Sequence, residues 1–354
     1  MDVNPINYKL TFEPDLKKFT FDGTESITAD CKKSTNLITM HCAELKITSC
    51  QVKSKGKIIK STPKVNEKNE ELGIKLSEKV KGKITIDLEF QGTLNDRLLG
   101  FYRSQYVQNG KTKYLATTQF EAADARRAFP CWDEPAAKAT FEISIIADNK
   151  FTAISNMPVK TKKKTKNKTI YNFSKTPIVS TYLIYLGVGE FEYLTSKVGK
   201  IQIRVVTTKG NKSKGKFSLD LGKKLLTSYE KYFGIKYPLP KLDLIAVPDF
   251  AAGAMENWGA ITFRETILLY DPKTSSTRTK QFIAEVISHE IAHQWFGNLV
   301  TMKWWNDLWL NESFATFMAT KFVDKFYPEW NLWDQFIEDA MNNAMGLDAL
   351  KTTH

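Results

Sequence analysis

Hydrophobic and polar residues alternate in short runs through about the first 190 residues of the chain. Alternation with a period of two is typical of β-strands that bury one face. Polar or glycine-containing turns separate the runs at intervals that suit hairpins, and no helical period competes with them. The runs that predict strands are Tyr8–Phe12, Ile27–Ala29, Leu37–Met40, Lys83–Phe90, Thr140–Ile146 and Tyr182–Leu186. We therefore expect residues 1–190 to form an all-β domain, a large antiparallel sheet or a sandwich.

The pattern changes from about residue 191, where runs with a helical period appear between strand-like runs. The predicted elements are a strand at Ile201–Val206, a helix at Leu219–Phe233, a strand at Leu242–Val247, and helices at 280–296 and 312–327. Gly297 and Asn298 give a stop signal for the first of the two later helices. Asn311 is a good N-cap for the second, which Pro328 ends. This layout predicts a second, α+β domain over residues 191–354.

The sequence His289-Glu290-Ile291-Ala292-His293 lies within the helix predicted at 280–296. Histidines four residues apart on a helix point the same way and can supply two nitrogen ligands to a zinc ion. Glu312, with eighteen residues between it and His293, can supply a third ligand from the next helix. The fourth position would stay open for water, as in catalytic zinc sites, and Glu290 can reach that water as general base.

The composition of the 354 residues is that of an ordinary globular chain, with 42% hydrophobic and 25% charged residues. The sequence contains no run of about eighteen apolar residues, the length needed to span a membrane. The N-terminal residues lack the basic and apolar regions of a secretory signal. We therefore expect a cytoplasmic protein without a membrane partner. The cysteines have no zinc-knuckle spacing and are expected to be reduced and partly buried: Cys31, Cys42, Cys50 and Cys131.

The net charge of +12 raises the question of a nucleic-acid partner. Much of the positive charge is local, in a lysine cluster over residues 160–168 between two strand-like runs. No aromatic residues are interleaved with these lysines, as a platform for stacked bases would require. We therefore expect a solvated hairpin tip and no nucleic-acid partner.

The segment Thr118–Pro135 differs from the rest of the predicted β domain. It carries dense charge among aromatic residues, and Pro130 and Pro135 exclude a regular strand. Two interpretations stay open: an ordered loop held by internal ion pairs, or a loop that carries Glu121 to a functional site.

Together these motifs resemble the aminopeptidase N family of gluzincin zinc metallopeptidases, over the whole chain. The resemblance rests on the zinc motif with Glu312, on Gly253-Ala254-Met255-Glu256-Asn257, on Trp304-Trp305 and Trp309–Glu312, and on Thr118–Pro135. It implies an N-terminal β-saddle domain and a thermolysin-like catalytic domain. It also implies that Glu121 and Glu256 bind the α-amine of a peptide. The stretch of Gly253, Ala254, Met255, Glu256 and Asn257 is expected to bind substrate.

The chemistry agrees with this resemblance. An α-amine has a pKa of about 8 and is largely a cation at neutral pH. Two carboxylates at a fixed distance from one zinc ion would hold that cation, so that only the first peptide bond reaches the activated water. The expected activity is therefore release of N-terminal residues from peptides with a free N-terminus, with Glu290 transferring the proton to the leaving amine.

The resemblance also shapes an expectation about the C-terminal end of the sequence. The family has a tyrosine well beyond the third ligand that donates to the oxyanion, whereas this sequence stops at His354. We therefore expect a fragment that binds zinc but is a weak catalyst alone. Phe317, Phe322, Trp330 and Trp333 are expected to be exposed and to favour self-association.

Three alternative functions compete with that of an aminopeptidase. A thermolysin-type endopeptidase would not need the two carboxylates at Glu121 and Glu256. A non-catalytic peptide-binding module would not need all three ligands and Glu290. Hydrolysis of a lipid epoxide belongs to a relative with glycine in place of Ala254.

Overall fold

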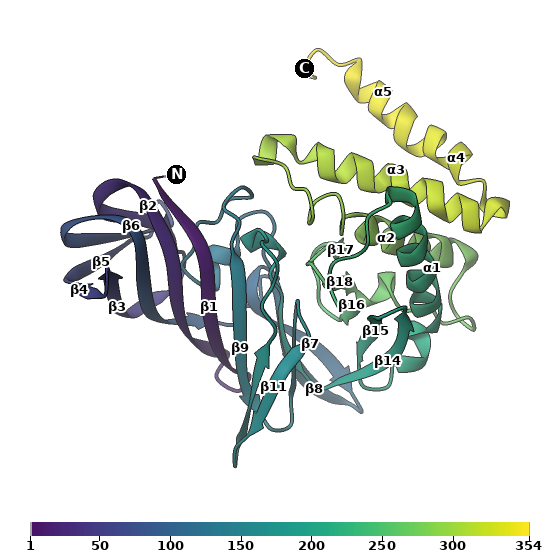
Figure 1. Ribbon diagram of the computed structural model, residues 1–354. Coiled ribbons are helices and arrows are strands. Elements are labelled where there is room, and N and C mark those ends of the chain that lie inside the picture. Colours follow the sequence, from purple (N-terminus) through teal and green to yellow (C-terminus); the bar gives the residue numbers. More distant parts are fainter. Residues whose placement is uncertain (1, 354) are drawn as a thin grey trace.

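The computed structural model describes residues 2–353. A nine-stranded sheet, at the left of Figure 1, has the order β11-β12-β9-β1-β2-β6-β3-β4, and β5 pairs with β6. Its strands are β1 (Val3–Asp15), β2 (Thr20–His41), β3 (Lys46–Ser54), β4 (Lys57–Ile59), β5 (Ser61–Asn66), β6 (Glu71–Thr93), β9 (Thr140–Asp148), β11 (Val159–Lys164) and β12 (Lys168–Phe173). β1 is antiparallel to β2 but parallel to β9, where Asn7 pairs with Thr140.

A four-stranded sheet shares its core with the large sheet. Its order is β10 (Thr152–Ser155), β13 (Leu186–Gly189), β8 (Lys111–Gln119) and β7 (Gly100–Gln108). Aromatic rings join the two sheets: the ring of Phe12 in β1 lies 5.9 Å from that of Phe101 in β7. A Cβ added at Gly92 of β6 would come within 2.2 Å of the Phe21 ring, so only glycine leaves room for that ring. The alternating pattern of the sequence thus buries one continuous aromatic core.

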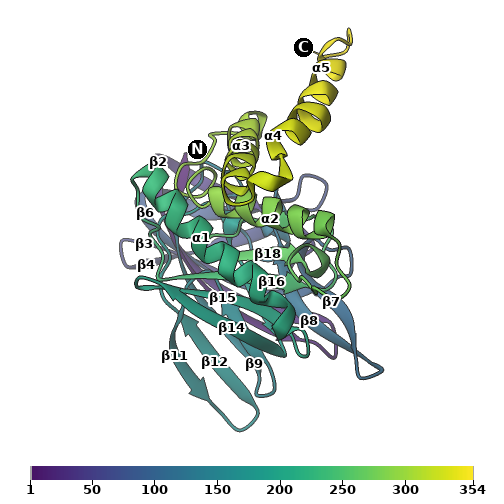
Figure 2. The same cartoon turned by 90° about the vertical axis from the view of Figure 1, so that its right-hand side faces the viewer.

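The second half of the chain is built on a five-stranded sheet covered by helices. Its order is β14 (Phe191–Val198), β15 (Ile201–Thr208), β16 (Lys241–Val247), β18 (Ala260–Arg264) and β17 (Ala254–Met255), with β15, β16 and β18 parallel. The helices are α1 (Lys216–Phe233), α2 (Thr277–Ala292), α3 (Trp309–Phe326), α4 (Leu332–Gln335) and α5 (Asn342–Asp348). Figure 2 shows α1 crossing one face of this sheet, with α2 and α3 above it.

The three long helices pack around Tyr229 of α1. Its hydroxyl lies 2.7 Å from the Ser288 hydroxyl of α2, and its ring lies 4.8 Å from the Phe322 ring of α3. The apolar face of α2 places Ile283, Ile287 and others in the core. This packing fixes α2 and α3 relative to each other, and both carry residues of the predicted metal site.

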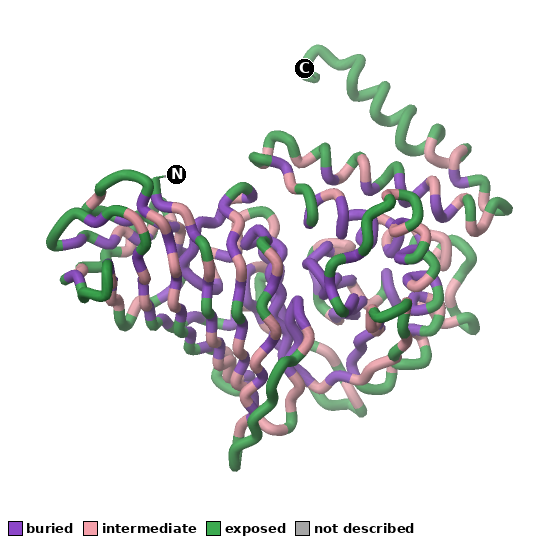
Figure 3. The backbone as a smooth tube through the Cα atoms, viewed as in Figure 1, coloured by how far each residue is buried: buried purple, intermediate pink, exposed green. Residues whose placement is uncertain are grey.

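The fold class predicted from the sequence is confirmed: an all-β region is followed by an α+β region. The domain boundary predicted at residue 190 falls between β13 and β14 and stays a prediction. The lysine cluster does form a hairpin, β11–β12, and Figure 3 colours its projecting end as exposed. All four cysteines are free, and three of them are buried. Within residues 2–353, no helix has the length and apolar character needed to cross a membrane.

Some local predictions were wrong. Only Leu186 of the segment Tyr182–Leu186 belongs to a strand, β13, because a 3₁₀ turn at Thr181–Leu183 precedes that strand. The backbone of this segment forms hydrogen bonds with groups outside any strand. The Leu183 carbonyl accepts from the Asn156 side chain at 2.7 Å and from the Trp258 N–H at 3.3 Å. A run of buried apolar residues does not by itself distinguish a strand from such a junction.

The helix ends also differ from the predicted ones. α2 ends at Ala292, before the expected stop signal, and α3 begins at Trp309, so Asn311 is inside the helix and not its N-cap. Phe322 was expected to be exposed but is buried against Tyr229, because it lies on the face of α3 that packs on α1. Phe317 is 40% exposed, as predicted.

Candidate functional site

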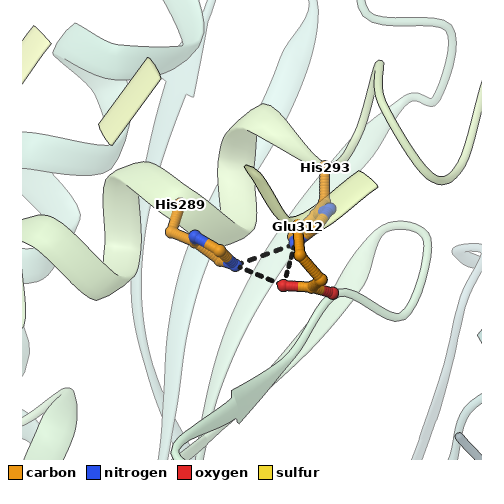
Figure 4. A group of neighbouring side chains, drawn as sticks. All are labelled: His289, His293 and Glu312. Carbon is orange, nitrogen blue, oxygen red and sulfur yellow. Dashed lines mark hydrogen bonds and ion pairs between the residues drawn. The ribbon is translucent and has the colours of Figure 1, made fainter. Parts of the chain in front are cut away.

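Three side chains, one from α2, one from the residue that caps the C-terminal end of α2 and one from α3, converge at the predicted metal site. Figure 4 shows His289, His293 and Glu312 pointing toward one another. The Nε2 atoms of the two histidines are 2.9 Å apart, and the Glu312 Oε2 atom lies 3.1 Å from that of His289 and 3.5 Å from that of His293. Two imidazole nitrogens and one carboxylate oxygen form a donor set that suits zinc.

The atoms around the histidines support ligation through Nε2. The Nδ1 atom of His293 lies 2.8 Å from the Phe296 carbonyl, and that of His289 lies 3.3 Å from the Thr316 hydroxyl. A backbone carbonyl can only accept, so Nδ1 of His293 carries the proton and its Nε2 is left with a free lone pair. The residues present therefore fit a zinc ion.

Glu290 lies beside the three donors and is buried. Its Oε2 atom has no hydrogen-bond partner within residues 2–353. Burial raises the pKa of Glu290 well above its ordinary value, and the nearby carboxyl of Glu256 raises it further. A cation held by the three donors would offset this repulsion. A carboxyl group in such surroundings is suited to accept and return a proton.

A second group of carboxylates adjoins the first and shares Glu312 with it. One carboxylate oxygen from each of Glu121, Glu256 and Glu312 lies within 4.8 Å of the others. Glu121 and Glu256 each have a buried oxygen without a hydrogen-bond partner in the described part of the chain. Burial, followed by repulsion from Glu256, raises the pKa of Glu121 to about 9. This group of carboxylates would be stabilised by a bound cation.

The segment Thr118–Pro135 combines the two interpretations that the sequence left open. Internal ion pairs are present, between Arg127 and Asp124 at 2.7 Å and between Arg126 and Asp133 at 3.2 Å. Glu121, near the start of the segment, lies beside Glu256. The ion pairs thus fix a loop that brings a carboxylate to the site.

The stretch Gly253–Asn257 forms the edge of the five-stranded sheet. Among the described strands, β17 pairs with β18 alone, through Ala254 opposite Phe263 and Met255 opposite Thr262. Met255 is buried, and Asn257 donates to the Thr262 hydroxyl at 3.1 Å, so these two side chains pack inward. The other edge of β17 has no strand partner within residues 2–353, which is the arrangement that allows an extended peptide to pair with a sheet edge.

Three residues near the site were not identified from the sequence. Gln119 is buried next to the Met255 sulfur, at 3.4 Å. Gln294 and Asn298 both donate to the Glu256 carbonyl. Gln294 and Asn298 follow His293, but a glutamine and an asparagine carry no motif of their own, and the sequence indicates Asn298 only as part of a helix stop signal.

Comparison with known proteins identifies both regions of the chain. Residues 4–183 match the Peptidase M1 N-terminal domain, and residues 217–354 match the Peptidase family M1 domain. Aminopeptidase M1 of Arabidopsis thaliana is 45% identical over 358 residues, which cover 99% of this chain and 40% of that protein. Puromycin-sensitive aminopeptidase of Caenorhabditis elegans is 46% identical over 360 residues, which cover 99% of this chain and 38% of that protein.

Aminopeptidase 2, mitochondrial, of Saccharomyces cerevisiae is 43% identical over 361 residues, which cover 100% of this chain and 38% of that protein. The chain thus spans about 40% of the length of the curated relatives that it matches. The resemblance to the aminopeptidase N family is confirmed. The two domain matches and the similarity along the whole sequence show that the chain belongs to peptidase family M1.

Proposed function

We propose that the protein to which this sequence belongs is a zinc-dependent aminopeptidase that releases N-terminal residues from peptides. His289, His293 and Glu312 would bind one zinc ion. The observation that carries the proposal is the second carboxylate group: Glu121 and Glu256 lie close to Glu312, and each has a buried oxygen without a hydrogen-bond partner within the described structure. A purely structural metal site would not need a second cation-binding group beside it.

Each residue would have one role in the reaction. Zinc, when bound, supplies Lewis-acid chemistry to the scissile carbonyl and the attacking water. Glu290 takes a proton from that water and returns it to the leaving amine. Glu121 and Glu256 hold the ammonium group of the substrate.

The edge strand β17 would position the peptide. Backbone groups of Gly253 and Ala254 would pair with the substrate, while Met255 and Asn257 would keep the strand in place. The names of the relatives support an aminopeptidase over an endopeptidase, since each is called an aminopeptidase.

We also propose that the protein is cytoplasmic and that its substrates are peptides with a free N-terminus. The location stays a prediction from the sequence, and one relative carries the word mitochondrial in its name. The absence of a nucleic-acid partner and the self-association of this chain also stay predictions.

The test compares an aminoacyl substrate with its N-acetylated form on the complete protein. Glu256→Gln should lower kcat/KM for the free-amine substrate at least about tenfold, because a charge-assisted contact contributes on the order of 1.5–3 kcal/mol. Glu329→Gln, an exposed carboxylate outside the site, serves as the matched control and should leave kcat/KM unchanged. Efficient cleavage of the acetylated substrate by the unaltered protein would contradict the proposal.

A further inference from the structure

Two buried amide side chains that follow His293 in the sequence reach the backbone of Glu256. The Gln294 Nε2 atom donates to the Glu256 carbonyl at 3.2 Å and to the Glu290 carbonyl at 3.2 Å. The Asn298 Nδ2 atom donates to the same Glu256 carbonyl at 2.8 Å. Both side chains are 0% exposed. A carbonyl oxygen has two lone pairs, so these two donors use its full capacity.

The same amides are fixed to the part of the chain that carries His293. The Asn298 N–H donates to the His293 carbonyl at 3.1 Å. The Gln294 Oε1 atom accepts from the Gly259 N–H at 3.3 Å, so Gln294 contacts the 256–259 turn at both ends. The backbone of Glu256 is therefore bound directly to the segment that follows one predicted zinc ligand, His293.

These bonds are not the ones that hold the helices together. α2 is anchored by Ile283, Ile287 and Ile291 in the core and by the contact between Ser288 and Tyr229. Gln294 and Asn298 lie beyond the end of α2 and face the substrate-binding stretch instead. What they fix is the separation between the metal ligands and the Glu256 carboxylate.

We propose that Gln294 and Asn298 are positioning residues that set the distance between the metal and the ammonium site. This distance restricts productive binding to substrates whose ammonium group is one carbon away from the scissile carbonyl. The inference rests on the proposed function, because it takes Glu256 to bind the amine. Beyond the proposed function, Gln294 and Asn298 are assigned the role of determining where the Glu256 carboxylate lies.

The test measures binding to the complete, zinc-loaded protein by calorimetry, with three hydroxamates that share one side chain. The first has an α-amine, the second has no amine, and the third has its amine one methylene further away. The variants are Gln294→Met and Asn298→Ala, each measured separately. Gln281→Met is the matched control, because Gln281 is an amide on α2 that bonds to Gln335 at 2.7 Å, away from the site.

The unaltered protein and Gln281→Met should bind the α-amino compound at least about tenfold more tightly than the compound without an amine, as expected for a charge-assisted bond. In Gln294→Met and Asn298→Ala this advantage should fall at least about fivefold, with zinc content and affinity for the amine-free compound unchanged. The preference for the α-amine over the displaced amine should fall with it.

Other outcomes distinguish a failure of the proposed function from a failure of the positioning role. No amine advantage in the unaltered protein would overturn the proposed function itself. An advantage that persists in both variants would overturn the positioning role alone. The amides would be structural only if both variants lost zinc, failed to fold, or bound all three compounds more weakly by the same factor. Any of these results would also overturn the positioning role.

Discussion

A triad of charges on β15 and β16, centred on a buried aspartate, gives a sharp prediction about stability. Asp243 of β16 is 0% exposed and accepts from Arg204 through both carboxylate oxygens, each at 2.6 Å. It also accepts from Lys241 at 2.7 Å, whose ammonium donates a second bond to the Gly259 carbonyl at 2.6 Å. Burial lowers the pKa of Lys241 to about 8, although Asp243 opposes that shift. The triad therefore holds two cations on one anion.

Asp243→Asn should lower the free energy of unfolding by about 3–5 kcal/mol, because it leaves the buried ammonium of Lys241 and the partly buried guanidinium of Arg204 without their counter-charge. Lys241→Met should cost less, at most about 2 kcal/mol, since the bidentate pair of Arg204 and Asp243 persists and a desolvated ammonium is removed. In the Asp243→Asn background, Lys241→Met should be stabilising by about 1–2 kcal/mol, because it relieves repulsion from Arg204.

The assay is urea unfolding at pH 7, followed by far-UV circular dichroism and tryptophan fluorescence. The matched control is the exposed pair of Lys216 and Asp220 on α1, 3.0 Å apart, whose neutralisation should change stability by less than about 0.5 kcal/mol. Additive losses from Lys241→Met and Asp243→Asn in the double variant would refute the reasoning, since they would mean that the two residues act independently.

Three further predictions test other parts of the molecule. His289→Ala should remove zinc, measured by elemental analysis, and leave the circular dichroism of the β-sheets unchanged; full zinc occupancy in this variant would reject the ligand assignment. Glu25 has both carboxylate oxygens buried without a partner in the described structure, and burial raises its pKa well above the ordinary value. The folded state then keeps a proton that the unfolded state releases, so stability falls as pH rises above about 4.3. Glu25→Gln should remove up to about 1.4 kcal/mol of this fall for each pH unit; equal slopes for both proteins in unfolding experiments from pH 5 to 8 would argue against it. Replacing Lys160, Lys163 and Lys164 of the exposed hairpin by glutamine should change the free energy of unfolding by less than about 0.5 kcal/mol, and a more than few-fold effect on peptide hydrolysis would reveal an unrecognised role.

The parts of the site that the sequence predicts are those set by local geometry. His289 and His293 are one helical turn apart, so any helix through them brings their rings together. Glu312 could be assigned because its spacing from His293 follows a known motif. The approach of Glu121 to Glu256 depends on how the two halves of the chain pack, and only the family resemblance predicted it.

The residues that sequence reasoning missed are those whose partners are distant in sequence. Gln294 and Asn298 bond to Glu256, about forty residues earlier, and an amide side chain carries no sign of such a partner. The segment Tyr182–Leu186 was misassigned for a similar reason. Its backbone bonds to Asn156 and to Trp258, which are brought together only by the tertiary structure.

The parallel pairing of β1 with β9 has a consequence for synthesis on the ribosome. Asn7 and Thr140 are 133 residues apart, and the stacked rings of Tyr8 and Phe141, 4.8 Å apart, join the same two strands. At about 5–20 residues per second, β9 emerges on the order of ten seconds after β1. Until then one edge of β1 has no permanent partner, so the nascent chain presents an apolar strand that a chaperone can bind. The large sheet is thus completed late, only after β9, β11 and β12 have been made.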